Sequence, residues 1–293
     1  RCLGNIDGRL TGAENTRKPA PGLPKFTMKE ISFVLLALVL IYLLISGYLY
    51  LFQRKLIYYP VLPDPTFQAQ AISIDNNGVK LHGWVLNPGK AKAVIYFGGN
   101  SELITHRSRY FETVFADYSV YLVDYRGYGT SEGSPGEAEL FSDALAIYDH
   151  ISLNHIGTDH SNASKPSITA YGRSLGSGVA VYLAANRPLE RLILLTPYDS
   201  IAEVAQKIYP LFPVRWLIQD RFDSASRAAD ISIPVLIASA ELDRVIALDN
   251  TLALRQRFTR ARLVYQQIKG AAHNDIIDFP QYRELVESFI GAN

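Results

Sequence analysis

The stretch that most constrains this chain is residues 168–178, an apolar run followed by Gly-Arg-Ser-Leu-Gly and then by a helix-forming segment. The pattern Gly-x-Ser-x-Gly between a strand and a helix predicts a sharp turn that exposes the serine. Side chains two residues to either side of the serine would collide in such a turn, which explains Gly172 and Gly176. The amide of Leu175 would open the helix, where unpaired N–H groups can face an anion. We therefore predict that Ser174 is a nucleophile; a plain turn between core elements is the alternative.

A second constraint is that residues 31–52 contain no charged side chain. As a helix they would be roughly 33 Å long, enough to cross a hydrocarbon core of about 30 Å. The run is longer than a signal-peptide apolar region, and no Ala-x-Ala-like site follows it. Aromatic residues near its end, then Arg54 and Lys55, are typical of a membrane interface. We expect a single-pass membrane anchor whose orientation the flanking charges leave open; a buried core helix is the alternative.

The segment before this run, residues 1–27, is polar and rich in Gly, Pro and basic side chains. We expect a disordered tail, or a segment upstream of a start at Met28, the single methionine. The formal net charge of +1 gives no reason to expect a nucleic-acid partner. The single cysteine, Cys2, excludes an intramolecular disulfide and a cysteine-based zinc site.

Residues 56–293 alternate between strand-like and helix-like segments. Residues 71–74 and 79–86 flank an Asn-Asn-Gly turn, which predicts a hairpin. Further strands are expected at 93–97, 119–124, 168–171, 192–195, 234–239 and 263–268, and helices at 102–115, 138–151, 179–184 and 282–290. The alternation predicts a mostly parallel, doubly wound α/β sheet. Together with the serine turn it predicts an α/β-hydrolase fold preceded by one transmembrane helix.

Residues 198–230 are an insertion between two of the expected strands. Its apolar part, residues 209–218, is broken by prolines. Such a segment suits a small lid over an active site or a surface that contacts a membrane. Phe212, Trp216 and Leu217 are candidates to line an acyl site, and lid packing without substrate contact is the alternative.

A serine nucleophile needs a base and an acid, which in this fold follow it in the order acid and then histidine. His273 is the only histidine after Ser174, and it follows the last expected strand. The acid should come just after the strand at 234–239, where Glu241 and Asp243 both qualify, and we favour Asp243. Asp243 would orient the imidazole of His273, which would take the proton from Ser174.

Two backbone amides are expected to form an oxyanion hole, those of Leu175 and of Asn100 at a Gly-rich strand exit. His155 and His160 lie in a polar loop, where solvated side chains are expected rather than metal ligands. We expect neither a metal nor a cofactor.

Five segments together carry a resemblance to a known family: residues 96–100, 124–129, 171–176, 243–245 and 273–275. From about Leu51 onward, the chain resembles the small membrane-anchored branch of the α/β-hydrolase superfamily. That branch is related to serine-aminopeptidase-like hydrolases and includes protein depalmitoylases and lysophospholipid lipases. The resemblance implies a supporting, non-catalytic role for the loop at 124–129. One position departs from the family, because Gly98 stands where a histidine is usual.

The leading interpretation is a membrane-anchored serine hydrolase that cleaves an ester or thioester, with a lipid-like acyl group as a plausible substrate. Its expected partners are the lipid bilayer and a small-molecule or acylated substrate. A peptidase of the serine-aminopeptidase type is the closest rival and would need an acidic pocket for a free amine. A non-catalytic membrane scaffold on the same fold is the third interpretation, against which the complete set of Ser174, Asp243 and His273 argues. Fold alone does not name the substrate.

Overall fold

The computed structural model describes residues 27–154 and 167–292, which separate into two units that meet between Gly47 and Tyr48. The expectation for residues 1–27 therefore falls outside the described residues except at Thr27, and so do His155 and His160.

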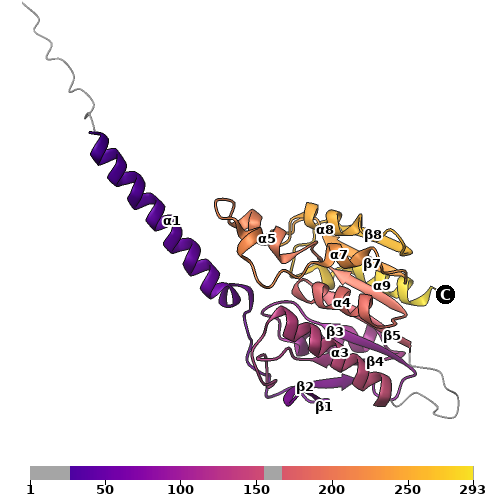
Figure 1. Cartoon of the computed structure of the whole chain (residues 1–293). Coiled ribbons are helices and arrows are strands. Elements are labelled where there is room, and N and C mark those ends of the chain that lie inside the picture. The colour runs from indigo at the N-terminus through magenta and orange to yellow at the C-terminus, as the bar shows by residue number, and fades with distance from the viewer. Residues whose placement is uncertain (1–26, 155–166, 293) are drawn as a thin grey trace, which may run out of the picture. The chain divides into compact units, whose positions relative to one another are not determined.

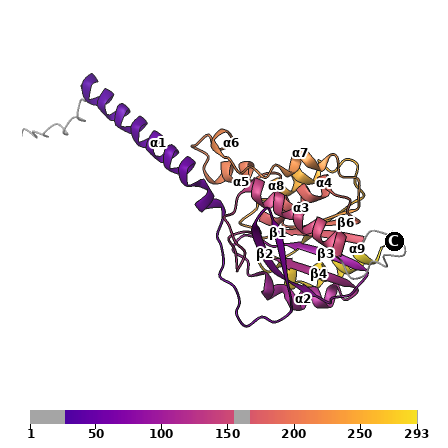
Figure 2. The same cartoon turned by 60° about the horizontal axis from the view of Figure 1, so that its bottom comes forward.

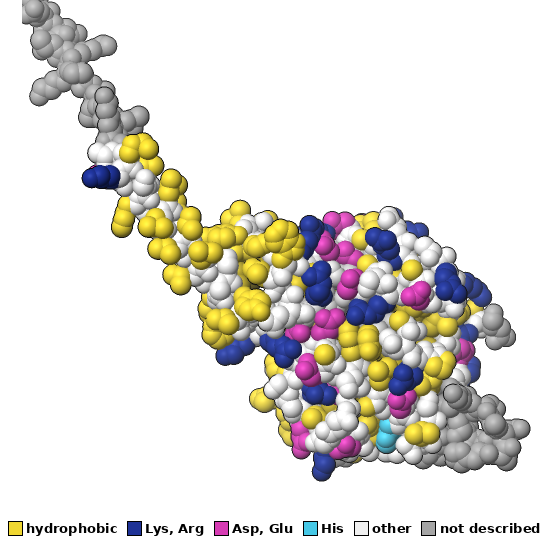
Figure 3. Space-filling model, in the orientation of Figure 1, with side chains coloured by type: hydrophobic (Ala, Val, Ile, Leu, Met, Phe, Trp, Pro, Cys, Tyr) yellow, Lys and Arg dark blue, Asp and Glu magenta, His cyan; other side chains and the backbone are white. Residues whose placement is uncertain are grey.

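A single helix, α1 (Met28–Ile57), extends beyond both ends of the expected residues 31–52. It begins at a capping box in which Thr27 Oγ1 accepts from the Glu30 amide at 3.3 Å and Glu30 Oε2 accepts from the Thr27 amide at 2.8 Å. By length and composition α1 can cross a membrane, and 0% of its most apolar window is buried. Figure 3 shows hydrophobic side chains along this helix.

The described strands form one sheet of eight strands in the order β1-β2-β4-β3-β5-β6-β7-β8 (Figure 1). The predicted hairpin is β1 and β2, which pair antiparallel, and β2 also pairs antiparallel with β4. From β4 onward the neighbours run parallel, as predicted. The bounds are β1 (Gln70–Asn76), β2 (Val79–Leu86), β3 (Lys92–Phe97), β4 (Tyr118–Val123), β5 (Ser167–Arg173), β6 (Arg191–Leu195), β7 (Val235–Ala240) and β8 (Leu263–Ile268).

Helices cover both faces of the sheet (Figure 2), because the central strands are apolar on both sides. One core cluster packs α3 (Glu137–Asn154), α4 (Leu175–Asn186) and α8 (Leu248–Arg255) against the sheet. The other packs α2 (Ser108–Val114) and α9 (Pro280–Gly291) against the opposite face. The carboxyl ends of the parallel strands therefore remain open for a site.

One local expectation needs correction, and the structure contains several elements that the sequence analysis did not expect. The helix expected at 102–115 is instead a short 3-10 helix, η1 (Ile104–Arg107), followed by α2. It starts after residue 102 because the Glu102 carboxylate accepts a hydrogen bond from the Gly99 amide in the preceding loop. Helix α8 was not predicted. The insertion contains α5 (Ile201–Ile208), α6 (Val214–Leu217) and α7 (Ser224–Ala228), and a second 3-10 helix, η2 (Ile276–Asp278), precedes α9.

A buried ion pair joins the loop after β4 to α3. Arg126 Nε donates to Asp143 Oδ2 at 2.7 Å, its Nη2 donates to Asp143 Oδ1, and Asn76 Nδ2 donates to the same Oδ1 at 2.7 Å. The side chains of Arg126 and Asp143 are 12% and 4% exposed. Removing one member of such a pair leaves a buried charge without a partner.

We expect Asp143→Ala to lower the free energy of unfolding by about 3 kcal/mol or more. The measurement is the fall in the thermal unfolding midpoint of the detergent-solubilised chain relative to the wild type. The matched control is Asp149→Ala, which breaks a pair with Arg187 whose side chains are 50% and 30% exposed. That change should cost about 1 kcal/mol or less. Equal shifts in the two variants would contradict the assignment.

Candidate active site

Ser174 lies on the turn between β5 and α4 with φ 49° and ψ −118°, a backbone conformation that side-chain-bearing residues rarely adopt. The two glycines of the motif make this turn possible. A Cβ at Gly172 would come within 2.4 Å of the Gly176 carbonyl oxygen, and one at Gly176 within 2.1 Å of the Phe97 carbonyl oxygen. The strand-turn-helix context predicted for Ser174 is therefore present.

The structure brings Ser174 together with His273 and Asp243. The Ser174 Oγ lies 3.0 Å from His273 Nε2, and His273 Nδ1 lies 2.8 Å from Asp243 Oδ2. Ser174 is 9% exposed, and the side chains of His273 and Asp243 are 8% and 6% exposed. Such a chain can pass a proton from the hydroxyl to the imidazole while the carboxylate orients the ring.

Of the two candidate acids, only Asp243 reaches the histidine. Its other oxygen, Oδ1, accepts from the amides of Val245 and Ile246 at 2.8 Å each, which fixes the carboxylate. Glu241 is exposed and accepts from the Gly270 amide at 2.8 Å instead.

The two predicted oxyanion residues, Leu175 and Asn100, line the same cavity as Ser174. Leu175 is the first residue of α4, where an amide has no carbonyl of a preceding helical turn to bind. The neighbouring Gly99 amide is engaged, because it donates to Glu102 Oε2 at 2.5 Å. Asn100 therefore lines the cavity, whereas the Gly99 amide is bound to Glu102.

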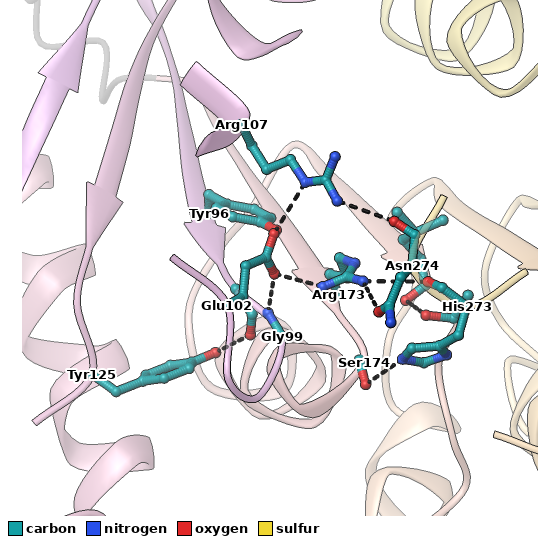
Figure 4. A network of polar contacts seen from close by, with 12 residues as sticks. Tyr96, Gly99, Glu102, Arg107, Tyr125, Arg173, Ser174, His273 and Asn274 are labelled. Carbon is teal, nitrogen blue, oxygen red and sulfur yellow. Dashed lines mark hydrogen bonds and ion pairs between the residues drawn. The ribbon is translucent and has the colours of Figure 1, made fainter. Parts of the chain in front are cut away.

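Glu102 is the centre of a buried polar network that the sequence did not reveal (Figure 4). Its carboxylate accepts from the Gly99 amide, from Tyr96 OH at 2.9 Å and from Arg173 Nη1 at 2.8 Å. Arg107 Nε lies 3.5 Å from the same carboxylate. Burial alone would raise the pKa of Glu102, but the Arg173 guanidinium and the donated hydrogen bonds outweigh burial and hold that pKa below its usual value.

Arg173 extends this network to the histidine loop. Its Nη2 donates to the His273 carbonyl at 3.3 Å and to Asn274 Oδ1 at 2.8 Å. One guanidinium next to Ser174 therefore contacts both the exit of β3, through Glu102, and the segment that carries His273 (Figure 4). The planar guanidinium of Arg173 carries several N–H donors in fixed directions, so it can bind both loops at once.

The loop at 124–129 supports the same strand exit. Tyr125 OH donates to the Gly98 carbonyl at 2.8 Å, and Tyr128 OH donates to Asn100 Oδ1 at 2.8 Å. A Cβ at Gly98 would come within 2.7 Å of Ile104 Cγ2. Tyr125, Tyr128 and Glu102 thus orient the loop around Gly98, the position where the family usually has a histidine.

The site opens into a cavity of about 370 Å³. Its lining comes from the end of α1, from α5 and α6 of the insertion, and from Val245 and Ile246. No charged side chain is among the described residues that line it, and most of them are apolar. Within the described residues, no group of three or more His, Cys, Asp or Glu side chains is placed to hold a metal ion.

The hypothesis that Trp216 lines an acyl site is wrong. Phe212 and Leu217 line the cavity, but Trp216 is 89% exposed and is not among the described lining residues. On the four-residue helix α6, adjacent residues point about 100° apart, so Leu217 can line the cavity while Trp216 faces solvent.

Comparisons with known proteins agree with this architecture. Residues 90–226 match the model of a family described as serine aminopeptidase, S33. The uncharacterized protein Rv2307c of Mycobacterium tuberculosis is 33% identical over 240 residues, covering 76% of this chain and 81% of that protein. The alpha/beta hydrolase domain-containing protein WAV2 of Arabidopsis thaliana is 28% identical over 227 residues, covering 67% of this chain and 72% of that protein. The Pyrococcus furiosus esterase Pf2001 superposes with a TM-score of 0.62 at 18% identity, covering 80% of this chain and 97% of that one.

The mostly parallel sheet and these similarities define a hydrolase class. The chain belongs to the α/β-hydrolase superfamily, which confirms the resemblance seen in its sequence motifs.

We expect Glu102→Gln to lower kcat for a p-nitrophenyl ester by roughly 10- to 100-fold, because the strand exit loses its charged acceptor and the Asn100 amide, which is predicted to bind an oxyanion, shifts. KM should change little, since Glu102 is not among the described residues that line the cavity. Steady-state kinetics separate the two parameters. Glu112→Gln, at an exposed position of α2, is the matched control and should leave both unchanged. A rise in KM with normal kcat would contradict the positioning role of Glu102.

Proposed function

We propose that this α/β-hydrolase is a serine hydrolase that cleaves esters or thioesters of apolar acyl groups. The observation that carries the proposal is that Ser174 lies 3.0 Å from His273 Nε2 and opens into an uncharged, largely apolar cavity. A nucleophile within reach of a base, and a base held by a third group, are what acyl transfer requires.

In the proposed reaction, Ser174 Oγ attacks the acyl carbonyl carbon while His273 Nε2 takes the hydroxyl proton. Asp243 accepts from Nδ1–H and stabilises the imidazolium. The amides of Leu175 and Asn100 bind the oxyanion that develops on the carbonyl oxygen. Collapse of the tetrahedral intermediate breaks the bond to the alcohol or thiol, which leaves with the proton from His273. Water, activated by the same imidazole, then releases the acid from Ser174.

The lining of the cavity supports an acyl group over a peptide amine. An aminopeptidase must hold a free ammonium group, for which a carboxylate in the pocket is the natural partner. The described lining residues include no carboxylate, although the matched family model carries an aminopeptidase description. Each buried methylene of an acyl chain is worth about 0.8 kcal/mol in such a lining.

We also propose that α1 anchors the enzyme in a membrane and that residues 56–293 are the hydrolase domain, with residues 198–230 as its lid. The length and composition of α1 support the anchor. Ile208, Leu211 and Trp216 of the lid are 62%, 80% and 89% exposed, and hydrophobic side chains gather over this region in Figure 3. Exposed apolar side chains of this kind suit contact with a lipid surface, which would be the partner of the lid.

Ser174→Ala should abolish labelling by a fluorophosphonate probe while the circular dichroism spectrum stays that of the wild type. Ser134→Ala, at an exposed loop position, is the control and should label normally. Labelling that persists in Ser174→Ala would reject Ser174 as the nucleophile, and an unlabelled wild type would favour the non-catalytic scaffold.

A substrate panel on the wild type separates the two enzyme classes. p-Nitrophenyl esters of increasing chain length should be hydrolysed, with kcat/KM rising with length, and aminoacyl p-nitroanilides should not. The opposite preference would support the peptidase.

Asp243→Asn should lower kcat by up to about 10⁴-fold, because the ring of His273 would lose the acceptor that selects its tautomer. Glu241→Gln removes a carboxylate that contacts Gly270 rather than the histidine, so its kcat should stay within a few-fold of the wild type. The larger loss in Glu241→Gln would assign the acid to that residue.

A further inference from the structure

The end of α1 lies against the catalytic domain and contributes to the cavity next to Ser174. Five residues at this end of the helix line the cavity, and so does Tyr59 just after it: Leu49, Tyr50, Gln53, Leu56, Ile57 and Tyr59. On the other side, the lining comes from α5 and α6 of the lid. The helix that would anchor the chain therefore also supplies part of the surface that an acyl chain would touch.

Gln53 joins this helix end to the lid. It is the one buried residue of α1, all of whose residues the structure describes, and it is 8% exposed. Its Nε2 donates to the Leu217 carbonyl at 3.3 Å, and its Oε1 accepts from the Gln219 amide at 2.6 Å. One side-chain amide thus satisfies a donor and an acceptor of the lid backbone, which explains a polar residue in this otherwise apolar lining.

Arg54 and Tyr58 add a second connection to the lid segment. Arg54 Nε lies 3.2 Å from Asp220 Oδ2, and Tyr58 OH donates to the same oxygen at 3.0 Å. The Asp220 side chain is 5% exposed and that of Arg54 is 49% exposed, so the carboxylate is buried while the guanidinium reaches solvent. The lid is therefore held to the helix at residues 217, 219 and 220.

Asn100 connects the helix end to the other side of the cavity. Its Nδ2 donates to the Ile57 carbonyl at 2.5 Å, and its Oδ1 accepts from the Tyr59 amide at 3.0 Å. Asn100 is also the residue whose amide is proposed to bind the oxyanion. The position of the helix end is thus set from the lid and from the strand exit at the same time.

We propose that the last turns of α1, Tyr48–Ile57, are part of the substrate site and determine which acyl chain lengths the enzyme accepts. The proposal rests on the proposed acyl hydrolase function. Because Gln53 and Asn100 fix the helix end against the lid and the strand exit, side chains on its cavity side set the space beside Ser174. Each methylene that no longer fits should lower kcat/KM about fourfold.

The first test compares two tryptophan substitutions in the full chain in detergent micelles. Leu49→Trp places a larger side chain in the cavity lining, whereas Leu51→Trp is the matched control, because Leu51 is 74% exposed and is not among the described lining residues. Leu49→Trp should lower kcat/KM for a palmitoyl ester at least 10-fold relative to an acetyl ester. Leu51→Trp should keep the wild-type profile. Identical profiles in both variants would overturn the proposal.

The second test removes the connection at Gln53. Gln53→Leu keeps the side-chain size but cannot bind the lid backbone, and Lys55→Leu, at an exposed position of α1, introduces the same residue as a control. We expect at least a 10-fold selective loss on long-chain esters in Gln53→Leu and none in Lys55→Leu. An equal loss on acetyl and palmitoyl esters would overturn the selectivity role and leave Gln53 as a purely structural contact.

Labelling by a small fluorophosphonate distinguishes this proposal from the function on which it rests. The two control variants, Leu51→Trp and Lys55→Leu, should label at the wild-type rate, and Leu49→Trp and Gln53→Leu should still be labelled, since labelling requires Ser174. A wild type that does not label would reject the hydrolase function itself. Normal labelling with unchanged chain-length profiles would reject only the role of α1.

Discussion

The buried ion pair between Glu102 and Arg173 is the interaction on which the arrangement of the site depends. Glu102 holds the strand exit after β3, and Arg173 is the residue before Ser174. Arg173 also reaches the His273 carbonyl, so the turn at Ser174, the loop after β3 and the loop that carries His273 share one charged junction. A buried pair of this kind adds little net stability, but either partner alone would be a buried charge. Its consequence is therefore geometric: the three loops are correctly placed together or not at all.

The cavity beside this ion pair is largely apolar and has no charged side chain among its described lining residues. Polar groups contact Ser174 on one side, and the rest of the cavity has an uncharged lining from α1 and the insertion at residues 198–230. One nearby charged pair, Arg54 with Asp220, is not among the described lining residues. An apolar acyl chain gains free energy by leaving water for such a lining, whereas an ammonium group would lose its hydration without a partner. The polarity of the cavity, more than the fold, therefore favours the proposed acyl hydrolase over an aminopeptidase.

Much of the fold could be predicted from the sequence because its signals are local. Alternation of apolar strands with helical segments indicated the parallel sheet, and an Asn-Asn-Gly turn indicated the β1–β2 hairpin. The elements that the sequence did not predict correctly also have physical reasons. Helix α8 has a weakly patterned surface, so nothing in its sequence distinguished it from a loop. The helix expected from residue 102 starts later, because Glu102 binds a backbone amide three residues before it.

By itself, the sequence determined the Ser174 turn and the apolar segment of α1. The turn follows from glycines two residues on either side of the serine, and the apolar segment from an uninterrupted run without charge. Only the tertiary structure decided that Asp243 rather than Glu241 meets His273, that Trp216 faces away from the cavity, and that Gln53 binds the lid. Each of these depends on contacts between residues far apart in the chain, such as Gln53 and Leu217, which lie 164 positions apart. Residue spacing reports which neighbours share a face of one element, but the packing of whole elements decides which distant side chains meet.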